Sequence, residues 1–331
     1  MIRRASSGAA PRLPAFMLPL MMCAFMACAL GAAPAFAQTE APSCSALVER
    51  FNAAIDAGRE FDAYKASEES LASPECSAFR MPMLRRLSAY RLNDAQTLMA
   101  RGRPVEEYEN SLAAAESAQV LWQASATLAE VRFGARRFAE AAQAYDRAIE
   151  IVKSETLTPN SPSPGEIQSL MDRAAQARLL AANEAPAKGK QQFVQTAANT
   201  AGGLGGVYSP LVRGIVPRAV PTSITFEYRS ADLTPVGEQA ARELLRAIIE
   251  QKPQKVRVVG HTDPRGGVEY NLKLSKARAE SVAQFLRANG VTAPIETEGV
   301  GSAEPMKING SAGLSQDDIN ALNRRVEWRR E

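Results

Sequence analysis

One stretch of the sequence decides the fold of the last third of the chain: residues 271–286 read NLKLSKARAESVAQFL. Apolar residues recur in it every three or four positions, and this period predicts an amphipathic helix from about Asn271 to Ala288. Its predicted buried stripe consists of Leu274, Ala277, Val282, Phe285 and Leu286. The segments on either side alternate polar and apolar residues instead, which is typical of half-buried strands.

Strands and helices alternate through the whole of this last third. The predicted strands are residues 223–228, 255–259, 295–300 and 325–329, and the predicted helices between them begin at Pro235, Asn271 and Asp317. Thr234 is the predicted N-cap of the first helix, with Pro235 at the first helical position. The order βαβαβαβ predicts helices that cover one face of a mixed sheet.

The preceding region, from Ser45 to about Asn183, has a helical period almost throughout. Glycines at positions 58, 102 and 134 interrupt the period, and each is followed by a short charged stretch and a new helical pattern. This punctuation is typical of helix–turn–helix pairs.

One helix pair, Ser125–Ile151, resembles a tetratricopeptide repeat. After its turn, Phe138, Ala141, Tyr145 and Ala148 follow at spacings of three, four and three, so that small residues allow close approach and aromatic residues fill the groove. The serine that opens the pair stands where the repeat usually has a large aromatic residue, and the usual proline after the second helix is absent. An α-helical bundle without a binding groove is the alternative.

The N-terminus is typical of a secretory signal. Arg3, Arg4 and Arg12 form a basic leader, an apolar run follows, and Ala35-Phe36-Ala37 places small residues where a signal peptidase reads them. Cleavage is therefore predicted before Gln38. Two alternatives stay open: an uncleaved membrane anchor, because the apolar run approaches spanning length, and a lipoprotein modified at Cys28.

Cleavage would leave a chain without a marked charge, because the three leader arginines are the only charges before Glu40. The 39 basic residues less these three equal the 36 acidic residues, so a nucleic-acid partner is not expected. Cys44 and Cys76 would remain, and an even count in an oxidising compartment predicts one disulfide, worth about 3 kcal/mol by loop entropy. Two unrelated buried thiols are the alternative. A metal site is not expected, since His261 is the only histidine.

Several separated motifs in the last third agree with one family. They are Asn271, Leu274-Ser275, Arg278-Ala279, Val282 and Leu286 in the helix, Leu233-Thr234-Pro235 and Gly260-His261-Thr262-Asp263 before it, and Gly299-Val300-Gly301 and Asn323-Arg324-Arg325-Val326-Glu327 after it. This part of the chain resembles the OmpA-like C-terminal domains, and the helix resembles their peptidoglycan-association motif. The resemblance implies a domain that holds the peptidoglycan wall non-covalently.

The predicted fold class is α+β, with an N-terminal all-α tetratricopeptide-like domain followed by an OmpA-like βαβαβαβ domain with a mixed sheet. The predicted divisions are a signal peptide (1–37), the helical domain (38–183), a linker rich in proline and glycine (184–220) and the OmpA-like domain (221–331). Apolar residues near the end of the linker suggest that part of it packs onto one domain.

The resemblance also implies the site residues. Arg278 would bind the carboxylate of diaminopimelate in a peptidoglycan stem peptide, and Asp263 would bind its amine end or the neighbouring backbone. The residue types suit these roles, because arginine presents a planar fork of donors that matches a carboxylate. Asn271 is the expected third contact, Thr262 a possible fourth, and Arg324 would reach the site from the C-terminal side.

Each of these residues also has a structural interpretation. Asp263 and Arg278 could form an ion pair that only braces a loop, and Asn271 could be a helix cap. Arg324 and Arg325 could simply alternate along a strand, with one of them exposed. His261 is interpreted as a hydrogen-bonding residue at the end of a strand.

The predicted function is that of a non-catalytic protein in the periplasm, either free or associated with the outer membrane. Its partners would be peptidoglycan and an envelope protein bound by the helical domain, with no cofactor. The alternative is a wall-modifying enzyme targeted by the same domain, but the helical region has no histidine and no acidic residue marked as catalytic. A porin-like barrel before the domain is not expected, because that region has a helical period.

Overall fold

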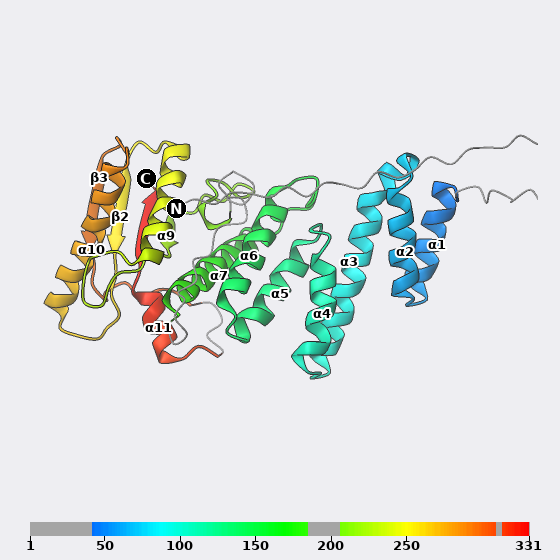
Figure 1. The fold of residues 1–331 in the computed structure, drawn as a ribbon, viewed down its shortest axis with the longest axis horizontal. Coiled ribbons are helices and arrows are strands. Elements are labelled where there is room, and N and C mark those ends of the chain that lie inside the picture. The colour runs from blue at the N-terminus through cyan, green and yellow to red at the C-terminus, as the bar shows by residue number, and fades with distance from the viewer. Residues whose placement is uncertain (1–41, 185–205, 309–312, 331) are drawn as a thin grey trace, which may run out of the picture. The chain divides into compact units, whose positions relative to one another are not determined.

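A computed structural model describes residues 42–184, 206–308 and 313–330 (Figure 1). The predicted signal peptide, with Cys28 and the cleavage site before Gln38, lies outside the described residues, as does part of the predicted linker. Within the described ranges, no helix has the length and apolar character needed to cross a membrane.

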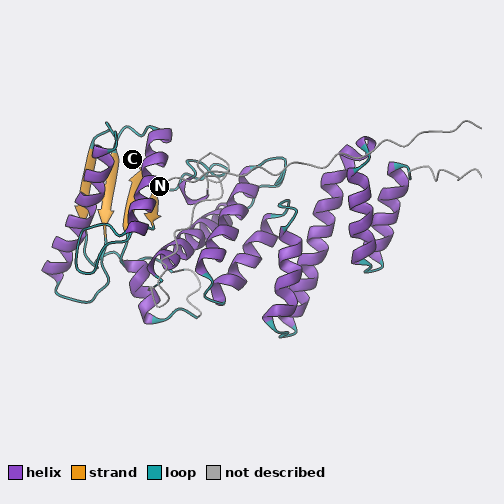
Figure 2. Ribbon diagram, in the orientation of Figure 1, coloured by secondary structure: helices purple, strands orange, loops and turns teal. Residues whose placement is uncertain are grey.

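Residues 42–184 are helical, as predicted (Figure 2). The helices are α1 (Cys44–Asp56), α2 (Glu60–Leu71), α3 (Ser77–Ala100), α4 (Val105–Glu116), α5 (Trp122–Gly134), α6 (Phe138–Lys153) and α7 (Pro164–Asn183), with a 3-10 turn, η1 (Pro74–Cys76), before α3. Helices that follow one another pack together along the series. Gly58 and Gly102 take the left-handed conformation after α1 and α3, whereas after α5 that conformation falls on Arg136 instead of Gly134.

The predicted pair of α5 and α6 packs through the residues expected from the sequence. Phe138, Ala141, Tyr145 and Ala148 are all buried on α6. The rings of Phe133 and Phe138 meet edge to face, with centroids 5.2 Å apart, at the turn between the two helices. The small residues Ala141 and Ala148 are thus buried together with the aromatic residues of the pattern.

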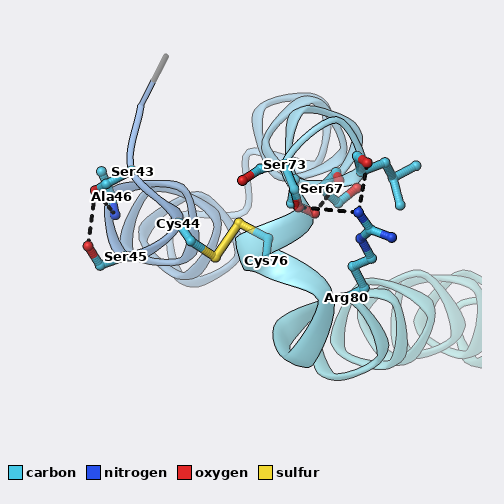
Figure 3. The surroundings of a disulfide bond; sticks show 10 residues. Ser43, Cys44, Ser45, Ala46, Ser67, Ser73, Cys76 and Arg80 are labelled. Atoms are coloured by element: carbon cyan, nitrogen blue, oxygen red, sulfur yellow. Dashed lines mark hydrogen bonds between the residues drawn. A yellow bond between two sulfur atoms is a disulfide. The ribbon is translucent and has the colours of Figure 1, made fainter. Parts of the chain in front are cut away.

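The predicted disulfide is present between Cys44, at the start of α1, and Cys76, at the end of η1 (Figure 3). The two Cα atoms are 5.3 Å apart, and 32 positions of sequence separate them. Arg80 on α3 supports the same region by donating hydrogen bonds to the carbonyl oxygens of Leu71 (2.8 Å) and Ser73 (3.2 Å). The disulfide therefore ties the first helix to the start of the third.

The C-terminal part is built on a mixed sheet in which the strands lie in the order β1-β4-β2-β3. The strands are β1 (Ala219–Thr222), β2 (Val256–Gly260), β3 (Ile295–Gly299) and β4 (Val326–Arg330). The helices between them are α9 (Pro235–Gln251), α10 (Val268–Ala288) and α11 (Gln316–Asn323). β2 and β3 are parallel, while β4 runs antiparallel to β1 and to β2. The predicted element order and the mixed sheet are confirmed.

The prediction of the first strand is wrong in position. Its residues, 223–228, lie outside the sheet, and β1 is the segment before them, which contains Pro221 and forms one edge of the sheet. The reason is the start of α9: the Thr234 amide donates to the Thr225 carbonyl (3.1 Å), and a side chain at Gly237 would collide with that carbonyl. The alternating segment therefore packs against a helix end instead of pairing with a strand.

The helix α10 lies unusually close to the parallel strands β2 and β3. Gly260 and Gly299 are paired at the ends of these strands, and a Cβ atom on either would clash with the α10 backbone at Ser275 or Lys276. Only glycine permits this approach. It places the loop that follows Gly260 directly beside the helix.

The helical region and the sheet share one hydrophobic core. The largest cluster of buried apolar residues runs from Ala129 on α5, through α6 and α7, to Trp328 on β4. The end of the predicted linker belongs to this core, because Tyr208 is fully buried and its carbonyl accepts hydrogen bonds from Gln251 on α9 and from Arg330 on β4.

A buried group of charges crosses the same interface. Arg178 on α7 donates to Asp146 on α6 (3.2 Å) and to Glu243 on α9, and none of the three side chains is more than 3% exposed. Burial, only partly opposed by the charge of Arg178, raises the pKa of Asp146 to about 7. Gly206 closes the group from one side, since a side chain there would strike the Asp146 carboxylate.

Loss of the disulfide is expected to lower the free energy of unfolding by about 3 to 4 kcal/mol, because the unfolded chain gains the freedom of the opened loop. Comparing Cys44→Ser/Cys76→Ser with the wild-type protein in urea denaturation, by far-UV circular dichroism, would measure this difference. A matched Ser43→Ala/Ser45→Ala variant, altered beside Cys44, should lose far less. Equal stability of the cysteine variant and the wild-type protein would contradict the prediction.

Asp146→Asn is expected to change how stability depends on pH. The pKa of Asp146 is raised on folding, so its contribution favours the folded state fully below about pH 4 and is lost as the pH rises through about 7. The free energy of unfolding should therefore fall less between pH 4 and pH 7 in Asp146→Asn than in the wild-type protein, as measured by urea denaturation across that range. The exposed Asp56 supplies the control variant Asp56→Asn, which should keep the wild-type slope. Identical slopes in all three proteins would contradict the assignment.

Candidate functional site

A pocket of about 840 Å³ opens beside the start of α10, next to the end of β2. Three segments distant in sequence line it: the loop after β1, the loop between β2 and α10 together with the first turns of α10, and the end of α11. The lining residues are Phe226, Glu227, Tyr228, Arg229, Thr262, Asp263, Arg265, Gly266, Gly267, Tyr270, Asn271, Leu274, Arg278 and Arg324. All five residues predicted to bind a ligand are therefore brought together.

The helix α10 presents one side to this pocket. Tyr270, Asn271, Leu274 and Arg278 follow the spacing of residues that share a helix face. The helix begins at Val268, earlier than the sequence predicted, with Gly267 as its N-cap. Asn271 is thus inside the helix, and the alternative that it serves as the cap is wrong.

Asp263 lies in the loop after β2 and is held by two arginines. Arg265 donates to its carboxylate from the backbone amide (3.0 Å) and from the guanidinium (2.8 and 3.2 Å), and Arg324 donates a further bond (2.9 Å). Burial acts to raise the pKa of Asp263, but the hydrogen bonds from Arg265 and Arg324 outweigh it and lower this pKa below the ordinary value. Asp263 is therefore a fixed anion at neutral pH.

Arg278 is a buried cation whose outer nitrogens have no acceptor among the described residues. Its side chain is 7% exposed, its Nε donates to the Ser230 carbonyl (3.1 Å), and its guanidinium lies 5.0 Å from the centre of the Phe226 ring. No hydrogen bond links its two terminal nitrogens to any part of the chain that the structure describes. Burial, and next the charge of Arg324, lower the pKa of Arg278.

Asp263 and Arg278 do not form an ion pair with each other. The ion pairs of Asp263 are with Arg265 and Arg324, while Arg278 is held by a carbonyl and an aromatic ring. The alternative of an Asp263–Arg278 pair that braces the loop is wrong. The two charges face the same pocket from different elements, with room between them.

Asn271 and Thr262 contribute in different ways. The Asn271 amide donates to the carbonyls of Asp263 (3.3 Å) and Arg265 (3.2 Å), so it fixes the loop that carries the anion. The Thr262 amide donates to the Gly301 carbonyl (2.9 Å), while its buried hydroxyl has no partner among the residues described. Thr262 thus lines the pocket with its hydroxyl withdrawn from solvent.

A second group of charges lies beside the site but does not line the pocket. Arg325 pairs with Glu327 (2.7 Å), and the Nε2 atom of His261 lies 3.3 Å from the same carboxylate. Burial acts to raise the pKa of Glu327, but His261 and Arg325 lower it to about 2. Arg324 and Arg325 therefore diverge, with the more exposed Arg324 in the pocket and Arg325 buried in this group.

The sequence did not indicate several residues of the pocket. Arg265 was missed, although its place two residues after Asp263 suits a bond back to that carboxylate. Tyr228 and the neighbouring Ser230, which binds Arg278, were missed because only the fold brings the loop after β1 to α10. Tyr270 was missed although it directly precedes Asn271 on α10. With Arg229 also present, four arginines and two carboxylates line the pocket, which favours an anionic or zwitterionic ligand.

Metal binding has no visible basis in the described ranges. No group of three or more histidine, cysteine, aspartate or glutamate side chains is placed there to hold an ion. The charged and polar side chains that line the pocket can pair with a ligand and form hydrogen bonds to it.

Comparison with known proteins agrees with the fold of this part. Residues 225–317 match the OmpA family, which confirms the predicted OmpA-like domain. The probable lipoprotein YiaD of Escherichia coli is 38% identical over 109 residues, which are 33% of this chain and 48% of that protein. The outer-membrane lipoprotein YfiB of Pseudomonas aeruginosa is 41% identical over 96 residues, which are 28% of this chain and 54% of that protein. The chain spans about half the length of the curated relatives it matches.

Among solved structures, the cell wall anchor of the T6SS from Pseudomonas aeruginosa aligns with 30% sequence identity. The alignment covers 34% of this chain and 80% of that one, with a TM-score of 0.28. The OmpA-like domain of FopA1 from Francisella tularensis aligns with 26% identity over 34% of this chain and 74% of that one, also with a TM-score of 0.28.

Arg265→Ala is expected to raise the pKa of Asp263, because it removes the side-chain donor that contributes most to holding the carboxylate ionised. Carboxyl chemical shifts followed by NMR during an acid titration would report this pKa. Arg287→Ala, altered near the other end of α10, is the control and should leave it unchanged. An unchanged Asp263 pKa in Arg265→Ala would contradict the prediction.

Proposed function

We propose, from the premise that residues 225–317 form an OmpA-family domain, that the protein is a non-catalytic binding protein of the periplasm. Its pocket takes the diaminopimelate of a peptidoglycan stem peptide. Arg278 binds a carboxylate of this residue, Asp263 binds its ammonium end, and Thr262 and Arg324 complete the contacts. The protein is free in the periplasm or associated with the outer membrane.

The main support for the proposal is the Arg278 guanidinium, whose two terminal nitrogens have no acceptor among the described residues. A buried cation is costly unless a partner neutralises it and accepts its hydrogen bonds. Within the described chain, the Arg278 side chain has only a carbonyl and an aromatic ring, and its two outer nitrogens border an open pocket. A ligand carboxylate supplies the missing charge and accepts both bonds in parallel.

The anionic half of the site supports a ligand that also carries a positive charge. The Arg265 side chain is 61% exposed, so it can move into solvent and a ligand ammonium can replace it on Asp263. The side-chain end of diaminopimelate has both an ammonium and a carboxylate on one carbon. It therefore matches an anion and a cation that face one pocket without pairing.

Catalysis is not part of the proposal. A general acid requires a raised pKa, whereas the pKa of Asp263 is lowered and its carboxylate is occupied by arginines. The two cysteines of the helical region are paired in the disulfide. Release of muropeptides from sacculi by the pure protein, abolished by a point mutation, would instead support the wall-modifying enzyme.

The helical region has the proposed role of binding another envelope protein. Phe61 (76% exposed), Tyr64 and Leu71 follow one another on α2 at positions that share a helix face. Crosslinking of the affinity-tagged protein in its own cells, followed by mass spectrometry, would identify the partner. Loss of the crosslinks in Phe61→Ala would place the contact on α2.

Asp263→Ala and Arg278→Ala are each expected to weaken binding to purified sacculi by at least about tenfold, because each removes one partner of a desolvated charge pair. Cosedimentation of the purified protein with sacculi measures this. Arg242→Ala, which removes an exposed arginine of α9, should bind as the wild-type protein does. Unchanged sacculus binding by folded Asp263→Ala and Arg278→Ala would overturn the site assignment.

A further inference from the structure

An exposed aromatic ring stands at the mouth of the pocket. Tyr228 is 85% exposed, the highest value among the large apolar side chains of the described residues, and it lines the same pocket as Asp263 and Arg278. Tyr270, which is 46% exposed, lines the pocket from α10. Exposed apolar surface beside a binding pocket marks a place where a ligand continues beyond it.

The loop that carries Tyr228 is fixed by its own hydrogen bonds. The Glu227 amide donates to the Asp232 carbonyl (2.9 Å), and the Ser230 amide donates back to the Glu227 carbonyl (3.1 Å). The Ser230 hydroxyl donates to the Asp232 carboxylate (2.6 Å). The loop bonds therefore fix the backbone from which the 85% exposed ring projects into solvent.

Two further features tie this ring to the site. Arg229, the next residue, has a φ of 57°, which residues other than glycine rarely adopt, and its guanidinium lies 5.4 Å from the centre of the Tyr228 ring. The Ser230 carbonyl accepts the hydrogen bond from Arg278. The loop is thus hydrogen-bonded to Arg278 through the Ser230 carbonyl, and it carries the exposed Tyr228 ring.

The position of the ring fits the length of a stem peptide. The diaminopimelate is the third residue after the sugar, and three extended residues span at most about 10 Å. Tyr228 is two residues from Phe226, whose ring touches Arg278, and two residues span at most about 7 Å. Because Arg278 and Tyr228 line one pocket, a peptide with its third residue at Arg278 can extend its sugar-bearing end toward Tyr228.

We propose that Tyr228 forms a second subsite, in which its ring stacks on the N-acetylated sugar that carries the stem peptide. Aromatic faces bind the C–H-rich faces of sugar rings in this way, and Tyr270 lines the same pocket from α10. This inference rests on the proposed function, because the peptide must occupy the pocket. With this second subsite, the protein binds a stem peptide that is still attached to the glycan strand more tightly than a stem peptide that has been cut free.

The test compares two ligands by isothermal titration calorimetry with the purified protein. One is the free tripeptide that ends in diaminopimelate, and the other is the same tripeptide on its disaccharide, released from sacculi by a muramidase. The wild-type protein is expected to bind the disaccharide form about fivefold more tightly, the gain of one aromatic contact. Tyr228→Ala should reduce this ratio of affinities to about one, whereas Tyr228→Phe should retain it.

Phe61→Ala is the matched control, because it removes an exposed aromatic ring on α2, outside the pocket, and should retain the wild-type ratio. Equal affinity of the wild-type protein for both ligands would overturn the second subsite alone and leave the proposed function standing. A ratio that persists in Tyr228→Ala would also overturn it. Failure of the wild-type protein to bind either ligand would overturn the proposed function together with this inference.

Discussion

The joining of the helical region to the sheet depends on one buried cation. Arg178 lies between Asp146 on α6 and Glu243 on α9, and all three side chains are withdrawn from solvent. Removal of Arg178 leaves two buried carboxylates without a counter-charge, which is costly. Because the surrounding apolar cluster is continuous from α5 to β4, the helices next to the sheet and the sheet itself are expected to unfold as one unit.

Arg178 and Arg278 are both buried arginines, but they differ in the partners that surround their guanidinium groups. Among the described residues, Arg178 is given two carboxylates, whereas Arg278 is given only a carbonyl and an aromatic ring. The first arrangement is complete and holds the structure together, whereas the second is incomplete and faces a pocket. The close approach of α10 to β2 and β3 fixes the position of Arg278, because Gly260 and Gly299 allow the helix to lie against the loop that carries Asp263. Burial without a counter-charge among the described residues thus distinguishes Arg278, the proposed binding residue, from Arg178.

The sequence predicted the element order and the core of the site, because both are carried by local patterns. The period around Arg278 and the position of Asp263 just after a strand are readable from neighbouring residues. The first strand was misplaced because alternation does not reveal whether a segment pairs with a strand or packs on a helix end, as Thr225 does. The bond from Arg278 to Ser230 and the buried pair of Arg178 with Glu243 join residues 48 and 65 positions apart, which no local pattern encodes.

The edge strands have a consequence for a protein that works in a crowded compartment. A free sheet edge is a template on which another chain can add a strand, the first step of aggregation. One edge here is β1, four residues long and interrupted by Pro221, which has no amide hydrogen to offer. The other is β3, where Glu296 and Glu298 are paired with Lys255 and Arg257 of the neighbouring strand. The sheet resists extension by a neighbouring molecule at both edges. At one edge β1 is short and contains a proline, and at the other edge β3 carries paired charges.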